Sequence, residues 1–238
     1  MNFTISNEYK SPNFNKRRDM GLLDAIIIHY TGMQNAESAL NYLCNKKSKV
    51  SSHYFINEEG QIFQLVDDFN IAWHAGVSKW LKRKNLNDTS IGIELVNPGH
   101  EHGYKVFSEK QYQSLEQLIK LLFSKYNIKK DWVLGHSDIA PSRKLDPGEN
   151  FDWYRLARKD LSIWPDKIFS VPDNIKSDQL LYNLLFNIGY DVKSYFKPSL
   201  IAFKRRFIPN DISEETNELV VNIAYSVSKA FSKVRSLY

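Results

Sequence analysis

Cysteine is almost absent from this chain of 238 residues. The single cysteine, Cys44, excludes a disulfide within the chain and any zinc site built from several thiolates. The sequence also has no apolar run near the roughly 18 residues that a membrane span requires. Residues 1–20 are polar and show no apolar core of a signal peptide. We therefore expect either a cytosolic protein or a mature form whose signal has been removed.

Charge of one sign is not in large excess either, with 32 Lys and Arg residues against 27 Asp and Glu residues. A net charge of +5 fits anionic polymers in general and distinguishes poorly between them. No nucleic-acid-binding motif accompanies this charge, so we expect no nucleic-acid partner. The content of 42% hydrophobic and 13% aromatic residues is typical of a globular protein with one or two domains.

One loop, residues 135–148, concentrates chemically active side chains. The apolar residues 132–134 precede it and indicate a buried strand. Two prolines and two glycines within the segment favour a rigid loop over a helix. An imidazole, two carboxylates and two cations lie in it: His136, Asp138, Asp146, Arg143 and Lys144.

A second histidine occupies a matching position. His29 follows residues 25–28, which form the most strand-like run of the chain. Two such strands lying side by side would bring His29 and His136 together. Neutral imidazoles bind zinc well, with a carboxylate as third ligand and water as fourth. The spacing alone leaves Asp138 and Asp146 both open as that carboxylate.

Five short segments appear in one order along the chain: Ile-Ile-Ile-His-Tyr-Thr (26–31), Ser-His-Tyr-Phe-Ile (52–56), Ala-Trp-His-Ala-Gly (72–76), Ser-Ile-Gly-Ile-Glu (90–94) and Gly-His-Ser-Asp-Ile-Ala-Pro (135–141). Together they resemble the zinc-dependent N-acetylmuramoyl-L-alanine amidases of the type 2 (AmpD-like) family, relatives of phage amidases and peptidoglycan recognition proteins. The resemblance covers residues 20–160.

The resemblance implies one zinc ion per chain, bound by His29, His136 and Asp146. Asp138 then becomes a structural residue that braces the loop. The resemblance also implies that Lys144 stabilises the oxyanion of the tetrahedral intermediate. The alternative for Lys144 is an ion pair with Asp138 or Asp146.

Glu94 lies inside an otherwise apolar strand, residues 90–96. A buried carboxylate must be paired, solvated or functional, and the pattern alone favours neither a structural nor a catalytic role. In the family resembled, this Glu lies at the active site, which makes Glu94 the expected general base. We expect substrate contacts from Tyr30, Trp73, His74, Ala75 and Arg143, most of them in a long loop over residues 70–88.

The remaining pattern predicts an α/β fold with a mixed sheet flanked by helices. Residues 1–20 read as an irregular arm. We expect a helix over 36–44, a hairpin over 52–66 that includes a core histidine at His53, and a helix opened by a Ser108 capping box. A short helix over 151–157 ends the predicted zinc amidase domain, residues 1–164.

After a predicted linker, residues 165–174, three amphipathic helices form a small all-α domain over residues 175–238. We place a cap at Ser177, a stop at Gly189 and helix starts at Pro198 and Ser213. The segment resembles the helical peptidoglycan-binding domain of wall hydrolases. The alternative is an appendage that only packs on the enzyme, and the cations at 204–206 are expected to form a solvated face.

The function that follows is hydrolysis of the amide between the lactyl group of N-acetylmuramic acid and L-alanine, in cell-wall turnover, remodelling or recycling. Its partners would be peptidoglycan or muropeptides, the 1,6-anhydro forms included. The alternative is a non-catalytic peptidoglycan-recognition module. A wall-binding domain favours the periplasm over the cytoplasm, and we expect a monomer.

Overall fold

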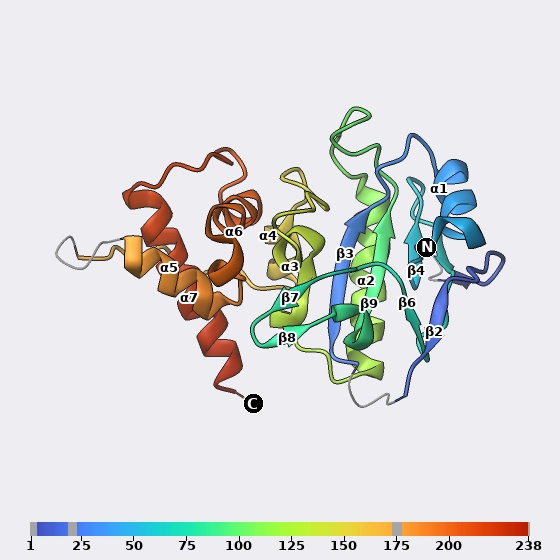
Figure 1. The fold of residues 1–238 in the computed structure, drawn as a ribbon, viewed down its shortest axis with the longest axis horizontal. Coiled ribbons are helices and arrows are strands. Elements are labelled where there is room, and N and C mark those ends of the chain that lie inside the picture. Colours follow the sequence, from blue (N-terminus) through green and yellow to red (C-terminus); the bar gives the residue numbers. More distant parts are fainter. Residues whose placement is uncertain (1–3, 19–22, 173–177, 238) are drawn as a thin grey trace.

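The computed structural model describes residues 4–18, 23–172 and 178–237, and its centre is a mixed sheet (Figure 1). Only the hairpin pair β5–β4 is antiparallel within this six-stranded sheet, and the other neighbours run parallel. This confirms the predicted fold class. In spatial order the strands are β1 (Ile5–Ser6), β5 (Ile62–Gln64), β4 (Tyr54–Ile56), β9 (Ser90–Leu95), β3 (Ala25–Tyr30) and β10 (Val133–Gly135).

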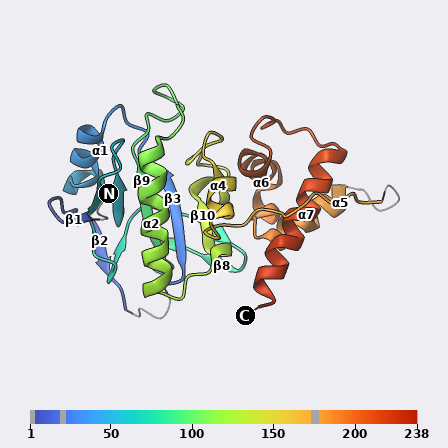
Figure 2. The same ribbon diagram turned by 180° about the vertical axis from the view of Figure 1, so that it is seen from behind.

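One face of the sheet packs against helix α2 (Glu109–Lys125), which lies across β9 and β3 in the reverse view (Figure 2). Alternate strand residues such as Ile26, Ile28 and Ile93 point into this layer because side chains alternate between the two faces of a strand. The predicted capping box is present, since the Ser108 hydroxyl accepts from the Gln111 amide at 3.1 Å.

The opposite face of the sheet is covered only in part, and the candidate site lies at its centre. Helix α1 (Ala36–Leu43) packs on Phe55 and Phe63 at one side. The segment after β5 crosses in front of β9 and β3 in Figure 1. The prediction of one long loop over residues 70–88 was wrong there. That segment contains β6 (Asn70–Ala72), β7 (Lys79–Trp80), β8 (Arg83–Lys84) and most of a 3-10 helix, η3 (Leu86–Thr89).

The prediction of an irregular N-terminal arm was also wrong. β1 forms the edge of the main sheet, and β2 (Phe14–Lys16) pairs antiparallel with β6. Strands of two or three residues are too short to show an alternating pattern, and their hydrogen bonds come from distant partners.

The loop after β10 begins with one helical turn, α3 (His136–Ile139), which corrects the expectation of a loop without helix. Gly135 leaves room for this turn, because a side chain there would meet Pro147 at 2.8 Å. Helix α4 (Trp153–Arg158) follows close to the predicted place.

Three helices end the chain: α5 (Asp178–Ile188), α6 (Val192–Phe207) and α7 (Glu218–Arg235). The predicted cap at Ser177 lies outside the described residues. Gly189 follows α5 as expected, with a φ of +138°, and its missing side chain makes room for Trp80. Tyr195 interrupts α6, so that Pro198 lies in the first turn of its second part. Asn217, and not Ser213, caps α7.

The three helices lie beside the β10 edge of the sheet in both views (Figures 1 and 2). They share one hydrophobic core with Ile27, Trp80 and Leu134 from the rest of the chain. The predicted linker also packs, since the Phe169 and Val171 amides donate to side chains of α7. The division into a catalytic and a wall-binding domain stays a prediction.

The cations at 204–206 do not form a solvated face, and this prediction was wrong. Lys204, Arg205 and Arg206 are all buried. Lys204 Nζ lies 2.8 Å from the Asp211 carboxylate, and Arg206 pairs with Asp138. Arg205 Nε lies 3.6 Å from the Glu149 carboxylate, so a carboxylate compensates each of the three buried cations.

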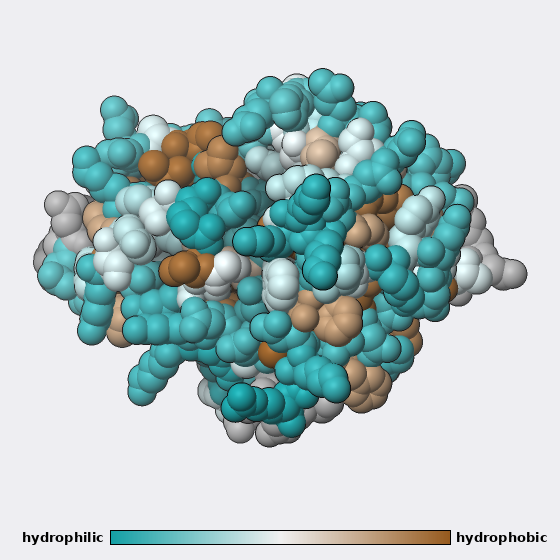
Figure 3. Space-filling model, turned by 45° about the vertical axis from the view of Figure 1, so that its right-hand side comes forward, coloured by the Kyte–Doolittle hydropathy of each residue, from teal (hydrophilic) through white to brown (hydrophobic). Residues whose placement is uncertain are grey.

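The face seen in Figure 3 is mostly hydrophilic, with hydrophobic residues in separate small groups. Among the described residues, no helix has the length and apolar character needed to cross a membrane.

Candidate active site

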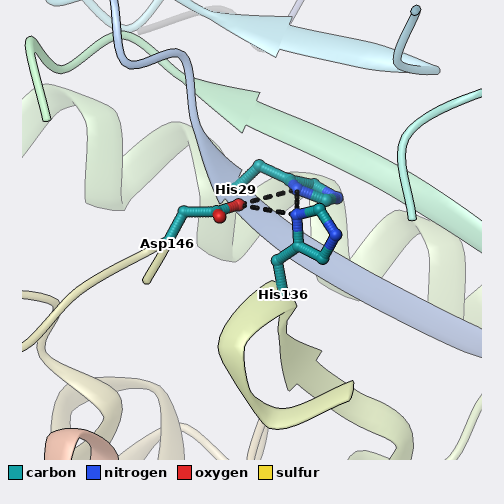
Figure 4. Close-up of side chains that lie close together, drawn as sticks. All are labelled: His29, His136 and Asp146. Carbon is teal, nitrogen blue, oxygen red and sulfur yellow. Dashed lines mark hydrogen bonds and ion pairs between the residues drawn. The ribbon is translucent and has the colours of Figure 1, made fainter. Parts of the chain in front are cut away.

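Two neighbouring parallel strands bring the two predicted histidines together (Figure 4). His29 lies near the end of β3, and alternation after the buried Ile27 turns it toward the uncovered face of the sheet. β10 pairs with β3 so that Gly135 lies opposite Ile28. His136 follows directly and therefore faces His29, as the sequence predicts.

Asp146 completes a buried cluster with the two histidines. Its Oδ2 atom lies 2.9 Å from His29 Nδ1 and 3.0 Å from His136 Nδ1. The two Nδ1 atoms are 3.0 Å apart, and one donor atom of each residue lies within 4.8 Å of the others. This geometry distinguishes between the two carboxylates that the spacing left open, because Asp138 points elsewhere.

Hydrogen bonds at the far side of each ring fix which nitrogen carries the proton. His136 Nε2 lies 3.1 Å from the Ala75 carbonyl oxygen, which can only accept, so Nε2 is protonated. The Nδ1 lone pair of His136 is therefore free to face the centre of the cluster.

A relay does the same for His29. The Ser90 hydroxyl donates to the Leu86 carbonyl at 2.5 Å and accepts from His74 Nε2 at 3.3 Å. His74 Nδ1 must then accept from His29 Nε2, which lies 3.0 Å away. His29 thus also presents an unprotonated Nδ1 to the cluster, and both rings have the tautomer that a metal ligand requires.

Gly92 makes this relay possible. A side chain at Gly92 would lie 2.5 Å from the His74 ring, so only glycine lets the imidazole pack on β9. The His74 and Ala75 amides both donate to Asn87 Oδ1, at 3.0 and 2.7 Å. Asn87 was not predicted from the sequence, because nothing in the local pattern connects it with His74 and Ala75.

Burial keeps the imidazoles of His29 and His74 neutral. Burial and the neighbouring His136 lower the pKa of His29 to about 4, and burial lowers the pKa of His74 well below its usual value. Burial alone would raise the pKa of Asp146, but the interactions with His136 and His29 outweigh it and hold that pKa well below its usual range. The cluster therefore offers a neutral imidazole at His29 and an ionised carboxylate at Asp146 near neutral pH.

Glu94 lies beside this cluster. It is the register partner of His29 on β9, and its Oε2 atom is buried without a hydrogen-bond partner among the described residues. Burial and the charge of Asp146 raise its pKa well above the usual value, although Lys144 acts in the opposite direction. An unpaired buried carboxyl is costly and marks a place where a ligand or water is expected.

A cleft of about 400 Å³ opens at the cluster. The predicted site residues that line this cleft are Tyr30, Trp73, His74, Glu94, Arg143 and Lys144. Lys144 is half-buried and, within the described residues, pairs with neither Asp138 nor Asp146.

Ala75 lies behind the wall of the cleft. It is buried, and its carbonyl oxygen accepts from His136 and from Arg143 Nη2, the latter at 3.0 Å. Its contacts orient other site residues. The rim includes His100, which the sequence analysis missed and which lies 2.9 Å from the Tyr30 hydroxyl.

The fold and the site together give an α/β protein with a candidate His-His-Asp metal centre at the carboxyl ends of parallel strands. The family model for N-acetylmuramoyl-L-alanine amidases matches residues 19–149. The chain belongs to this family, and the predicted family and enzyme class are confirmed.

Two amidases are similar to this chain in sequence over most of its length. The N-acetylmuramoyl-L-alanine amidase AmiD of Escherichia coli is 35% identical, over 89% of this chain and 84% of AmiD. The 1,6-anhydro-N-acetylmuramyl-L-alanine amidase AmpD of Haemophilus influenzae is 34% identical, over 64% of this chain and 90% of AmpD.

Solved structures show the same likeness. E. coli AmiD in complex with the substrate anhydro-N-acetylmuramic acid-L-Ala-D-γ-Glu-L-Lys superimposes with a TM-score of 0.77 at 32% identity, over 90% of this chain and 92% of AmiD. AmpDh3 of Pseudomonas aeruginosa, in complex with anhydromuramic pentapeptide, gives a TM-score of 0.78 at 28% identity, over 96% of this chain and 98% of AmpDh3.

Proposed function

We propose that this amidase uses one zinc ion, bound by His29, His136 and Asp146, to hydrolyse the amide between the lactyl group of N-acetylmuramic acid and L-alanine. The observation that supports it best is the convergence of His29 Nδ1, His136 Nδ1 and Asp146 Oδ2 within 4.8 Å. Three such ligands with an open fourth position are typical of catalytic zinc sites, whereas structural sites use four protein ligands.

The residues present fit the ion. Both imidazoles are held in the required tautomer by outer contacts, and the carboxyl of Asp146 is ionised because its pKa is low. A zinc ion bound there supplies a Lewis acid that lowers the pKa of a coordinated water and polarises a carbonyl oxygen.

Glu94 is proposed as the general base. Its buried Oε2 atom has no partner among the described residues and lies on the same face of the sheet as His29. A raised pKa brings a carboxylate closer to neutral pH, where it accepts a proton from the attacking water and passes it to the leaving amine.

Lys144 is proposed to stabilise the oxyanion. The ammonium lines the cleft and, within the described part of the chain, forms no ion pair with either loop carboxylate. A preorganised donor of this kind contributes about 3 kcal/mol to transition-state stabilisation.

The proposed substrates are muropeptides, the 1,6-anhydro forms included, and intact peptidoglycan. Both solved relatives contain an anhydromuramyl peptide, and the cleft has the size of a ligand pocket. Tyr30, Trp73 and Arg143 line it and are proposed to contact the sugar or the peptide. The non-catalytic alternative is less well supported, because the complete set of proposed ligands and both catalytic groups are present.

We propose the cell envelope as the place of action, since wall polymer is the substrate. Detection of the chain only in a cytosolic fraction would contradict this.

The activity is tested by incubating the purified chain with anhydro-N-acetylmuramyl tripeptide and analysing the products by mass spectrometry. We expect a free tripeptide that begins with L-alanine, and no product when a zinc chelator is in excess. Cleavage at another bond, or unchanged cleavage with the chelator, would contradict the proposal.

A further inference from the structure

Asp138 lies two residues after His136, yet its carboxylate is bound mainly by the C-terminal helices. Arg206 Nη1 donates to Asp138 Oδ2 at 2.6 Å, and the Tyr190 hydroxyl donates to Asp138 Oδ1 at 2.7 Å. The remaining contact comes from the Gly135 amide, which donates to Oδ2 at 2.9 Å. Asp138 is only 1% exposed, so these contacts are shielded from water.

Arg206 also contacts the strand on the other side of His136. Its Nη2 atom donates to the Val133 carbonyl at 3.3 Å and to the Ser162 hydroxyl at 3.0 Å. The guanidinium lies 3.9 Å from the centre of the Trp153 ring, so packing fixes its plane as well. Arg206 therefore binds the backbone before His136 and the side chain after it.

We propose that Arg206 and Tyr190 are positioning residues of the metal centre, and that α6 and the turn after α5 hold His136 in the geometry of a ligand. This rests on the proposed zinc site. A ligand's position depends on its supporting contacts, and loss of such contacts typically costs about 10- to 100-fold in metal affinity or activity. The planar, five-donor guanidinium suits a site that must bind a carboxylate and a carbonyl at once, which lysine cannot reproduce.

The test must separate positioning from plain stability, and Arg235 offers a matched control. It too joins the C-terminal helices to the rest of the chain, through Asp131 at 3.1 Å. It also donates to the carbonyl oxygens of Asn187 and Ile188, both at 2.7 Å, and its guanidinium lies 4.9 Å from the centre of the Phe231 ring. None of these contacts reaches the turn that carries His136.

The experiment compares the full chain with its Arg206→Met, Arg206→Lys, Tyr190→Phe and Arg235→Met variants. Zinc affinity is measured by competition with a chelating dye, well below the melting temperature of each metal-free variant. We expect Arg206→Met to lose about 10- to 100-fold in zinc affinity and Arg206→Lys to lose less. Arg235→Met should melt earlier but bind zinc within about twofold of wild type.

Two results would overturn the inference. One is a folded Arg206→Met variant with unchanged zinc affinity, and the other is an equal loss of affinity in Arg235→Met at matched stability. If Arg206→Met does not fold, Tyr190→Phe decides, because it removes only one hydroxyl, and unchanged affinity in that variant refutes the role. A wild-type chain that binds no zinc would instead refute the proposed function itself.

Discussion

His29 and Glu94 are register partners on the parallel strands β3 and β9, so both side chains leave the same face of the sheet. His29 belongs to the proposed ligand set, and Glu94 has a buried carboxylate oxygen with no hydrogen-bond partner among the described residues. The pairing of β3 with β9 places the proposed base beside a proposed metal ligand. Zinc binding and proton transfer are proposed to depend on different residues, so the two are separable by mutation.

We expect Glu94→Gln to retain zinc and fold but to lose about 10²- to 10⁴-fold in kcat, because the amide has nearly the same shape but cannot accept the proton. Single-turnover kinetics on an anhydromuropeptide would measure the loss. Glu101→Gln, at an exposed carboxylate that also lines the cleft, is the control and should stay within a few-fold of wild type. Equal activity of both variants would show that another group is the base.

Lys144→Met should reduce kcat by about 10²- to 10³-fold and leave zinc affinity near that of wild type, since the lysine is proposed to act on the oxyanion. Lys82→Met, at an exposed position, serves as the control. A change in KM alone would show that Lys144 binds the substrate in its ground state, and would argue against the oxyanion role.

The stability of the metal-free chain should fall as pH decreases below about 6.5. Burial lowers the pKa of His53 from 6.5 to about 3, so between these values the unfolded chain binds a proton that the native chain does not. Each such group costs about 1.36 kcal/mol of unfolding free energy per pH unit across that window.

The measurement is denaturant unfolding between pH 4 and 7 with excess chelator. His53→Gln should make the pH dependence shallower by about one proton. An identical slope in the His53 variant would contradict the buried, neutral state of that ring.

The predicted separate domain at residues 175–238 implies that truncation leaves an intact amidase. The shared core of Ile27, Trp80 and Leu134 with the C-terminal helices leads us to expect the opposite. Removal of residues 172–238 should lower the melting temperature and reduce activity on soluble fragments and sacculi alike. An unchanged melting temperature, with activity lost only on sacculi, would support an independent wall-binding domain.

The sheet that positions the site was predictable because its information is local. The apolar run before His29 and the run before His136 each mark a buried strand. The structure places these strands side by side as expected, and they run parallel. The capping box at Ser108 and the end of helix α5 at Gly189 were also predictable, because each depends on residues that are neighbours in the sequence.

The partners of buried charges were not predictable. The spacing in the sequence could not choose between Asp138 and Asp146, because the number of residues in a loop does not determine which way a carboxylate points. Arg206 looked like part of a solvated face because its partner, Asp138, lies 68 positions away in the sequence. Long-range compensation of this kind appears only when the helices are packed against the sheet.

His29, His136 and Asp146 are proposed to bind the zinc on which amide hydrolysis depends. The most direct test measures bound zinc by elemental analysis together with the release of tripeptide from anhydro-N-acetylmuramyl tripeptide, for the chain and for the Ala variant of each ligand. We predict about one zinc per wild-type chain, and the loss of both zinc and cleavage in every variant. A full equivalent of zinc and undiminished cleavage in Asp146→Ala would contradict the account.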